Sequence, residues 1–291
     1  MSVVHLKELQ DDIDALYREG KISDNETFQS YVSTKKFEVP ESFPDAKFVI
    51  VLAIFNPHAL ANFLYKGQKH EIMIPSNYYD NDFTKEQIEY TVLNKIIGQS
   101  GYRIEDVRRS YLMKRLAVRS DLAKYGRNNI TYVGELGSAI TLYAYLTDYE
   151  FEEDNWTDVQ MMEICEDCKI CLNRCPTGAI SEDDFVIDIT KCIPLYNEVG
   201  GEFPEDIPED AHNALVGCMR CQEKCPGNRE SNKRTRQLED VTEEETTSIL
   251  EGSPDEALVE SLTKKLRGFP WATKIEYIPM LTRNLSVLIE R

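Results

Sequence analysis

Apolar residues recur every three or four positions near the start of the chain. Residues 5–19 carry this helical pattern, and Gly20 follows it as a stop signal. The next apolar segment, residues 46–55, is instead a continuous run of β-branched and aromatic side chains preceded by Pro44. A run of that length suits a buried strand better than a helix. The pattern therefore predicts a helix followed by a strand inside a sheet.

Two further segments extend this mixed pattern. Thr84 and Gln87 have the form of a capping box, and isoleucine and valine then recur on one face until Gly98, which predicts a second helix. Residues 130–148 read as two strands joined by a glycine-bearing turn, although a helix is an alternative for the second of them. The first half of the chain is therefore expected to be an α+β domain.

Composition changes in the acidic stretch 148–167, and all eight cysteines follow within about 61 residues. Beyond them, Thr242 with Glu245 and the Ser253-Pro254 pair announce helix starts, and an apolar stripe continues over residues 280–288. We therefore expect three parts: an α+β domain over 1–154, a cysteine-rich module over 155–230 and a short helical region over 231–291.

The charge balance restricts the partners. Asp and Glu number 51 against 33 Lys and Arg, a formal net charge of -18, which argues against a nucleic-acid substrate. The basic stretch 103–127 is the exception, and is either a solvated helix face or an anion-facing surface. The longest uncharged apolar stretch, residues 48–57, is about half the length of a membrane helix. With no export signal visible at the N-terminus, the expected location is the cytoplasm.

The cysteines give the strongest chemical signal. Four of them spell C-x-x-C-x-x-C-x-x-x-C-P, the run that binds a [4Fe-4S] cluster in bacterial ferredoxins: Cys165, Cys168, Cys171 and Cys175, followed by Pro176. A second motif repeats its last part as C-x-x-C-x-x-x-C-P: Cys218, Cys221 and Cys225, followed by Pro226. The second motif lacks a first cysteine, and Cys192 is the one left to supply it.

In two-cluster ferredoxins the fourth cysteine of each motif ligates the other cluster. This rule assigns one cluster to Cys165, Cys168, Cys171 and Cys225, and the other to Cys192, Cys218, Cys221 and Cys175. Zinc and disulfide bonds are the alternatives, but zinc sites usually pair two C-x-x-C motifs, and disulfides belong to exported proteins. Clusters that exchange ligands lie close together, so the module is expected to conduct electrons at low potential between a donor and an acceptor.

Three segments resemble the epoxyqueuosine reductase family, which is itself related to the cobalamin-dependent reductive dehalogenases. They are CEDCKICLNRCPTGAI, KCIPLYNE and GCMRCQEKCPGN. Residues 116–129, LAVRSDLAKYGRNN, and residues 137–148, GSAITLYAYLTD, are similar to the family's segments around its G-[RK]-N triplet and the following G-S pair. The resemblance covers residues 44–230.

The resemblance implies a nitroreductase-like domain that binds cobalamin or another cobamide beside a ferredoxin-like module with two [4Fe-4S] clusters. It places Gly126, Arg127 and Asn128 near the corrin, with Gly137 and Ser138 close by. For the two glycines, simple turn chemistry is the alternative. A flavin is a further possibility for this domain, because folds of this kind commonly bind one.

The family's catalytic carboxylate has no clean match. A gapless alignment puts Val107 in its place, so Asp106 fits with a shift of one residue, and Asp121 stands where the family has glycine. Asp106 is therefore the candidate general acid, or else a surface residue in a charged turn, and Tyr111 and Tyr125 are alternative proton donors. The four histidines form no metal-binding spacing and are expected at the surface or in caps.

These observations favour an iron–sulfur, cobalamin-dependent oxidoreductase that passes electrons from two clusters to a corrinoid. Its substrate would be a small molecule, or a corrinoid protein that needs reductive reactivation, and its electron donor a ferredoxin or flavodoxin. The acidic charge makes tRNA a poor candidate for the substrate. The alternative, from a different class, is a non-catalytic ferredoxin-type electron carrier that docks on a basic partner.

Overall fold

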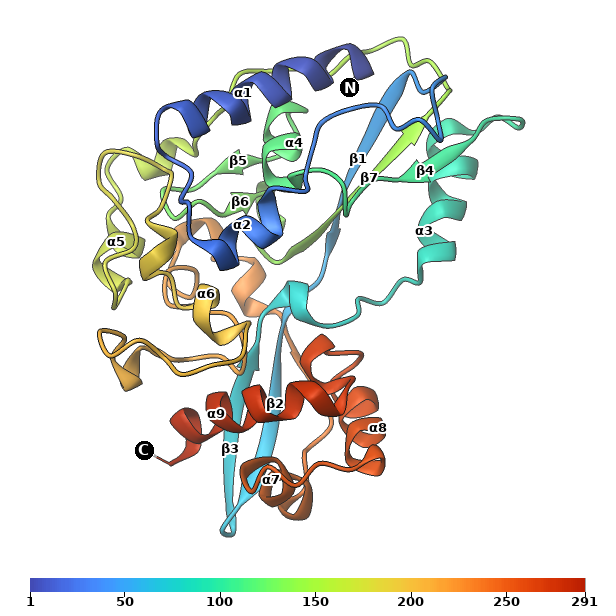
Figure 1. Cartoon of the computed structure of the whole chain (residues 1–291). Coiled ribbons are helices and arrows are strands. Elements are labelled where there is room, and N and C mark those ends of the chain that lie inside the picture. Colours follow the sequence, from blue (N-terminus) through green and yellow to red (C-terminus); the bar gives the residue numbers. More distant parts are fainter. Residues whose placement is uncertain (291) are drawn as a thin grey trace.

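The computed structural model describes residues 1–290 and has a mixed α and β architecture (Figure 1). Its central sheet has three antiparallel strands in the order β1-β7-β4: β1 (Phe48–Phe55), β7 (Ile140–Thr147) and β4 (Ile104–Asp106). The helices around it are α1 (Leu6–Arg18), α2 (Glu26–Val32), α3 (Lys85–Thr91), its π-helical continuation Val92–Ile97, and α4 (Met113–Arg119).

Alternate side chains of the sheet enter two separate cores. Val49 and Leu146 pack in one core with Leu9 of α1 and with α4, whereas Ile50 and Tyr145 pack in another with α3. Successive strand residues point to opposite faces, so β1 and β7 are covered on both sides. This two-sided burial explains why the sequence of β1 is continuously apolar instead of alternating.

The elements predicted in this half are present. The capping box of α3 forms between Thr84 and Gln87, and Gly98 ends the helix in the left-handed conformation with φ of 68°. Residues 130–148 contain strands, including β7, so the helical alternative for the second run is wrong. A short hairpin precedes β7 and consists of β5 (Lys124–Tyr125) and β6 (Thr131–Tyr132).

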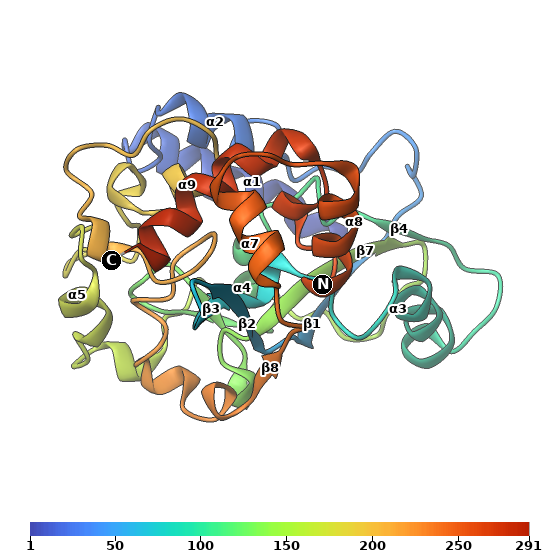
Figure 2. The same cartoon turned by 90° about the horizontal axis from the view of Figure 1, so that it is seen from below.

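A second sheet lies below the first, as Figure 1 shows. It has the order β3-β2-β8, with β2 (His58–Tyr65), β3 (Gln68–Ile74) and β8 (Thr235–Gln237). The predicted C-terminal helices pack on it, as the view from below shows (Figure 2): α7 (Glu243–Leu250), α8 (Glu256–Lys265) and α9 (Ile278–Ile289). The β2–β3 hairpin therefore shares a core with the C-terminal region, although the predicted boundaries place it in the first domain.

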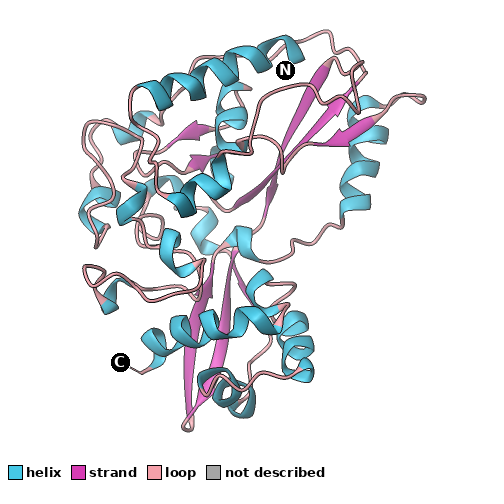
Figure 3. Cartoon of the chain, viewed as in Figure 1, coloured by secondary structure: helices cyan, strands magenta, loops and turns pink. Residues whose placement is uncertain are grey.

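The cysteine-bearing module lies to one side of the two sheets, near the level where they meet, and is mostly loop (Figure 1 and Figure 3). Its regular elements are short helices, among them α5 (Ile170–Arg174) and α6 (Pro194–Asn197). Across residues 1–290, no helix has the length and apolar character needed to cross a bilayer. The mixed architecture agrees with the α+β prediction, and the nitroreductase-like detail remains a prediction.

Candidate iron–sulfur and cofactor site

The structure sorts the eight cysteines into two groups, and none of them is in a disulfide bond. One small cavity is lined by Cys165, Cys168, Cys171 and Cys225. A larger cavity is lined by Cys175, Cys192, Cys218 and Cys221. Each group takes three cysteines from one end of the module and one from the other. These are the same two ligand sets that the motif spacing predicts.

The chemistry of both groups suits a metal cluster. Burial and the neighbouring thiols raise the pKa of Cys192 to about 12 and that of Cys218 to about 11. Burial, together with nearby Cys225, likewise raises the pKa of Cys171 to about 11. Four neighbouring thiols that repel one another as thiolates need a bound cation to stay deprotonated. Among residues 1–290 no set of His, Cys, Asp or Glu is arranged around a single metal ion.

The segment Gly126–Asn128 lies between the two groups of cysteines. The Arg127 guanidinium donates to the carbonyl oxygens of Cys165 and Glu182. Asn128 lines both cavities, and its Nδ2 donates to the Cys221 carbonyl at 3.4 Å. A Cβ atom at residue 126 would lie 2.6 Å from Asn128 Oδ1. Only glycine therefore allows the backbone to pass this close to the Asn128 side chain. The structure thus places Gly126 and Arg127 beside the small cavity, and only Asn128 at the large one.

The turn at Gly137 and Ser138 holds the module to the central sheet. Gly137 has φ of 58°, and a Cβ there would lie 2.3 Å from Asn228 Oδ1. The Ser138 amide donates to the same oxygen at 2.7 Å, and Asn228 Nδ2 donates to Ser138 Oγ at 2.8 Å. Because Asn228 follows Cys225 by three residues, this contact positions a cysteine of the small cavity. Ser138 also lines the large cavity.

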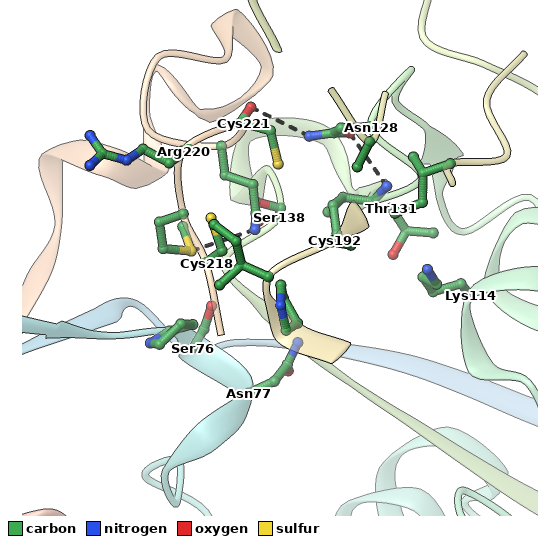
Figure 4. Close-up of a pocket in the computed structure, with 18 of the residues that line it drawn as sticks. Ser76, Asn77, Lys114, Asn128, Thr131, Ser138, Cys192, Cys218, Arg220 and Cys221 are labelled. Atoms are coloured by element: carbon green, nitrogen blue, oxygen red, sulfur yellow. Dashed lines mark hydrogen bonds between the residues drawn. The ribbon is translucent and has the colours of Figure 1, made fainter. Parts of the chain in front are cut away.

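The large cavity has a volume of about 550 Å³ and extends from the four thiols to the end of the central sheet. Figure 4 shows thiols on one side of it, with Ser76 and Asn77 on another and Lys114 facing in from α4. A second cavity, also about 550 Å³, shares Asn77 and Arg108 with the first. The two cavities adjoin and together offer space for a group larger than a typical drug-sized ligand.

Sequence reasoning missed two residues of the large cavity. His58 was expected at the surface or in a cap, which is wrong, because it is only 4% exposed and lines the cavity. Burial lowers the pKa of Lys114 to about 8, and its Nζ donates to the Asn129 carbonyl at 2.9 Å. A single histidine before a strand, or a lysine within a basic stretch, carries no sequence signal of a cavity.

The basic stretch 103–127 is only partly solvated. Its buried members are Arg115, Arg119 and Arg127, whereas Arg103, Arg109, Lys114 and Lys124 are exposed. Arg119 is buried; it packs over Trp156 with its guanidinium carbon 3.9 Å from the ring centre and donates to the Thr157 carbonyl at 2.8 Å. Arg115 is also buried and lies within 3.9 Å of Asp12. These arginines hold α4 against α1 and the chain that follows β7.

The proton-donor candidates occupy different places. Asp106 ends β4, lines the second cavity and accepts a hydrogen bond from the Arg108 amide at 2.9 Å. Tyr111 lies in the core and donates to the Glu38 carbonyl at 2.6 Å, and Tyr125 packs against Phe185. Of the three, only Asp106 lines either of the two adjoining cavities, and it lines the second one. Val107, its neighbour in the gapless alignment, is buried in the core.

Comparison with known proteins first identifies the class of domain to which the cysteines belong. Residues 164–228 match the family of 4Fe-4S double cluster binding domains. All eight cysteines lie within this match, so they belong to a domain of the kind that holds two [4Fe-4S] clusters.

The similarity extends beyond this domain. An epoxyqueuosine reductase of Staphylococcus aureus is 26% identical over 234 residues, which cover 77% of this chain and 59% of that protein. The structure of epoxyqueuosine reductase from Streptococcus thermophilus has a TM-score of 0.70 at 18% identity and covers 99% of this chain and 75% of that one. An epoxyqueuosine reductase solved with an epoxyqueuosine-modified tRNA-Tyr stem loop has a TM-score of 0.64 at 18% identity and covers 97% and 74%.

The resemblance to epoxyqueuosine reductases is thus confirmed, and the chain shares their fold. It spans only about three fifths of the length of the Staphylococcus aureus relative.

Proposed function

We propose that this chain is an iron–sulfur reductase that passes electrons from two [4Fe-4S] clusters to a cofactor in the large cavity, and from there to a substrate. One observation carries the proposal: Cys175, Cys192, Cys218 and Cys221 form part of the wall of that cavity. A cluster held by these thiols would directly adjoin any molecule bound there. A simple electron carrier has no use for such a cavity, so the reductase is favoured over the carrier.

The ligand sets define the direction of electron flow. Cys165, Cys168, Cys171 and Cys225 would hold the outer cluster, whose cavity has exposed Ile164 and Ile170 at its rim. Exposed apolar side chains beside a redox centre suit the docking of a ferredoxin or flavodoxin as electron donor. The other four cysteines would hold the inner cluster, and Asn128 lies against both sites. Electrons would then pass from the donor to the outer cluster, the inner cluster and the cavity.

A cobamide is the cofactor that we propose for the cavity. The two adjoining cavities offer the room, and uncharged hydrogen-bonding side chains such as Ser76, Asn77 and Thr141 suit the carboxamides around a corrin ring. When bound, a cobamide supplies a strongly nucleophilic low-valent cobalt. The protein's own residues would orient the ring, exclude water and hold the inner cluster beside it. A flavin is the competing cofactor for the same space.

The second cavity is the proposed substrate entrance. Asp106 and Arg108 line it, so a carboxylate and a guanidinium are both available to a substrate that enters there. Asp106 would act as the proton donor. Although one solved epoxyqueuosine reductase binds a tRNA stem loop, the net charge of -18 on this chain favours a small molecule or a corrinoid protein as substrate.

The test is a titration of the anaerobically purified protein with cob(II)alamin, with FMN in parallel. We expect stoichiometric binding of cob(II)alamin with the electron paramagnetic resonance spectrum of base-off cobalt, and reduction of that cobalt when the clusters are reduced. Binding of FMN alone would make the protein a flavoenzyme. Binding of neither would leave the electron carrier as the function.

A further inference from the structure

His58 occupies an unusual position for a histidine that neither binds a cluster nor faces solvent. It is the first residue of β2, follows Pro57, and is only 4% exposed. Its side chain lines the large cavity together with Ser76 and Asn77, whose placement Figure 4 shows. It is the one histidine that lines this cavity within residues 1–290.

The two ring nitrogens of His58 have different surroundings. Nδ1 lies 3.2 Å from Ser76 Oγ, which is within hydrogen-bonding distance. Nε2 is fully buried and has no hydrogen-bond partner among the described residues. A buried polar atom without a partner costs about 1–3 kcal/mol. Such an atom in the wall of a cavity points to a partner on whatever molecule occupies the cavity.

Ser76 determines which nitrogen carries the proton. Its backbone carbonyl is fixed because it accepts a hydrogen bond from Asn56 Nδ2. Its hydroxyl has no other acceptor among the hydrogen bonds of residues 1–290, so donation to His58 Nδ1 is the arrangement that uses the hydroxyl proton. The neutral imidazole then carries its own proton on Nε2. The cavity thus receives an N–H donor.

The surroundings keep this imidazole uncharged. Burial lowers the pKa of His58 to about 4, and besides the cluster cysteines the charged side chains that line the same cavity are the cations Arg108, Lys114 and Arg220. A neutral N–H group suits a neutral or partly negative oxygen on the ligand. An ammonium group or a further N–H donor on the ligand would not suit it, because neither offers an acceptor.

We propose that His58 is a positioning residue whose Nε2–H donates a hydrogen bond to an oxygen acceptor of the cofactor in the large cavity, with Ser76 fixing the tautomer. For a cobamide, the acceptor is a carboxamide oxygen at the edge of the corrin. This inference deepens the proposed function and rests on it. It concerns the binding and orientation of the cofactor, not the transfer of electrons or protons.

The experiment measures the dissociation constant of cob(II)alamin by anaerobic spectral titration of the intact protein and four variants. H58A removes the N–H donor, and H58Q places an amide N–H near the position of Nε2. S76A removes the hydroxyl group that fixes the tautomer of His58. H70Q changes the half-buried histidine on the neighbouring strand β3, which does not line the cavity, and is the matched control. Iron content is measured for every variant, so that loss of a cluster is not mistaken for loss of a contact.

We expect cob(II)alamin to bind H58A about tenfold more weakly than the parent, as the loss of one hydrogen bond inside a cavity implies. S76A should bind about threefold more weakly, and H58Q and H70Q should stay within about twofold of the parent. The inference is overturned if H58A with full iron content binds as tightly as the parent, or if H70Q weakens binding as much as H58A. If the parent itself binds no cob(II)alamin, the proposed function fails, and the contact assigned to His58 fails with it.

Discussion

Replacing Asn228 with alanine should loosen the cluster bound by Cys225. Asn228 is fully buried in the turn that follows this cysteine. Three of its side-chain hydrogen bonds hold the turn: Oδ1 accepts from the Ser138 amide at 2.7 Å, and Nδ2 donates to Ser138 Oγ at 2.8 Å and to the Gln222 carbonyl at 3.1 Å. N228A removes all three and leaves the buried Ser138 amide without an acceptor.

The magnitude follows from these contacts. A hydrogen bond contributes about 0.5–1.5 kcal/mol net, and an abandoned buried donor costs about 1–3 kcal/mol. We therefore expect local opening of the turn after Cys225 to become easier by about 3 kcal/mol, which is roughly a hundredfold in the opening equilibrium. N228D should behave similarly, because its carboxylate keeps the acceptor but faces the Gln222 carbonyl with a charge in place of a donor.

The assay is the rate at which an excess of iron chelator bleaches the visible absorbance of the clusters under anaerobic conditions. The control is N232A, because Asn232 is only partly buried and its side chain makes one hydrogen bond, from Nδ2 to the Glu223 carbonyl at 2.8 Å. We expect bleaching about a hundredfold faster in N228A and within a few-fold of the parent in N232A. Equal rates in N228A and the parent would refute the idea that this turn secures the cluster.

Three further predictions follow from the same site. Because Cys225 and Cys192 are each assigned to only one of the two clusters, C225A and C192A should each retain about four irons per chain with a [4Fe-4S] spectrum, and loss of all iron from either would contradict the assignment. K114M removes a cation from the cavity wall near Cys192, so the potential of the inner cluster should fall by about 40 mV in a redox titration; an unchanged potential would show that Lys114 does not influence this cluster. His58 has its pKa lowered by burial to about 4 from 6.5, so it stabilises the fold fully above pH 6.5 and loses this contribution as the pH falls toward 4. Urea denaturation should show the parent losing about 2 kcal/mol more than H58Q between pH 7.5 and pH 5, and parallel curves would disprove that His58 is buried and neutral.

The local patterns in the sequence predicted most of the elements and the grouping of the cysteines. The capping boxes at Thr84 and Thr242 both form, because N-terminal capping depends on residues within one helical turn. The α8 helix differs slightly, since Asp255 caps it by accepting from the Leu258 amide at 2.7 Å, whereas Ser253-Pro254 marked its start in the sequence. Cluster motifs are equally local, because their ligand spacing is set by the size of one metal group.

Contacts between distant segments could not be predicted in this way. The β2–β3 hairpin pairs with β8, about 175 residues later, through the parallel register of Ala59 with Arg236, and no local pattern indicates that partner. His58 and Lys114 reach the same cavity from separate elements, so neither has a sequence signal. The glycines at 126 and 137 were open to a turn interpretation: crowding by neighbouring atoms explains Gly126, whereas Gly137 has both the positive φ of a turn and crowded surroundings.

The most direct test of the account is the metal content of the anaerobically purified protein, measured as iron, acid-labile sulfide and zinc, together with Mössbauer spectroscopy of the iron. Two interlocked clusters predict about eight irons and eight sulfides per chain, all in [4Fe-4S] form. About four irons per chain, or zinc in place of iron, would contradict the claim that the two groups of cysteines hold two clusters beside the cavity.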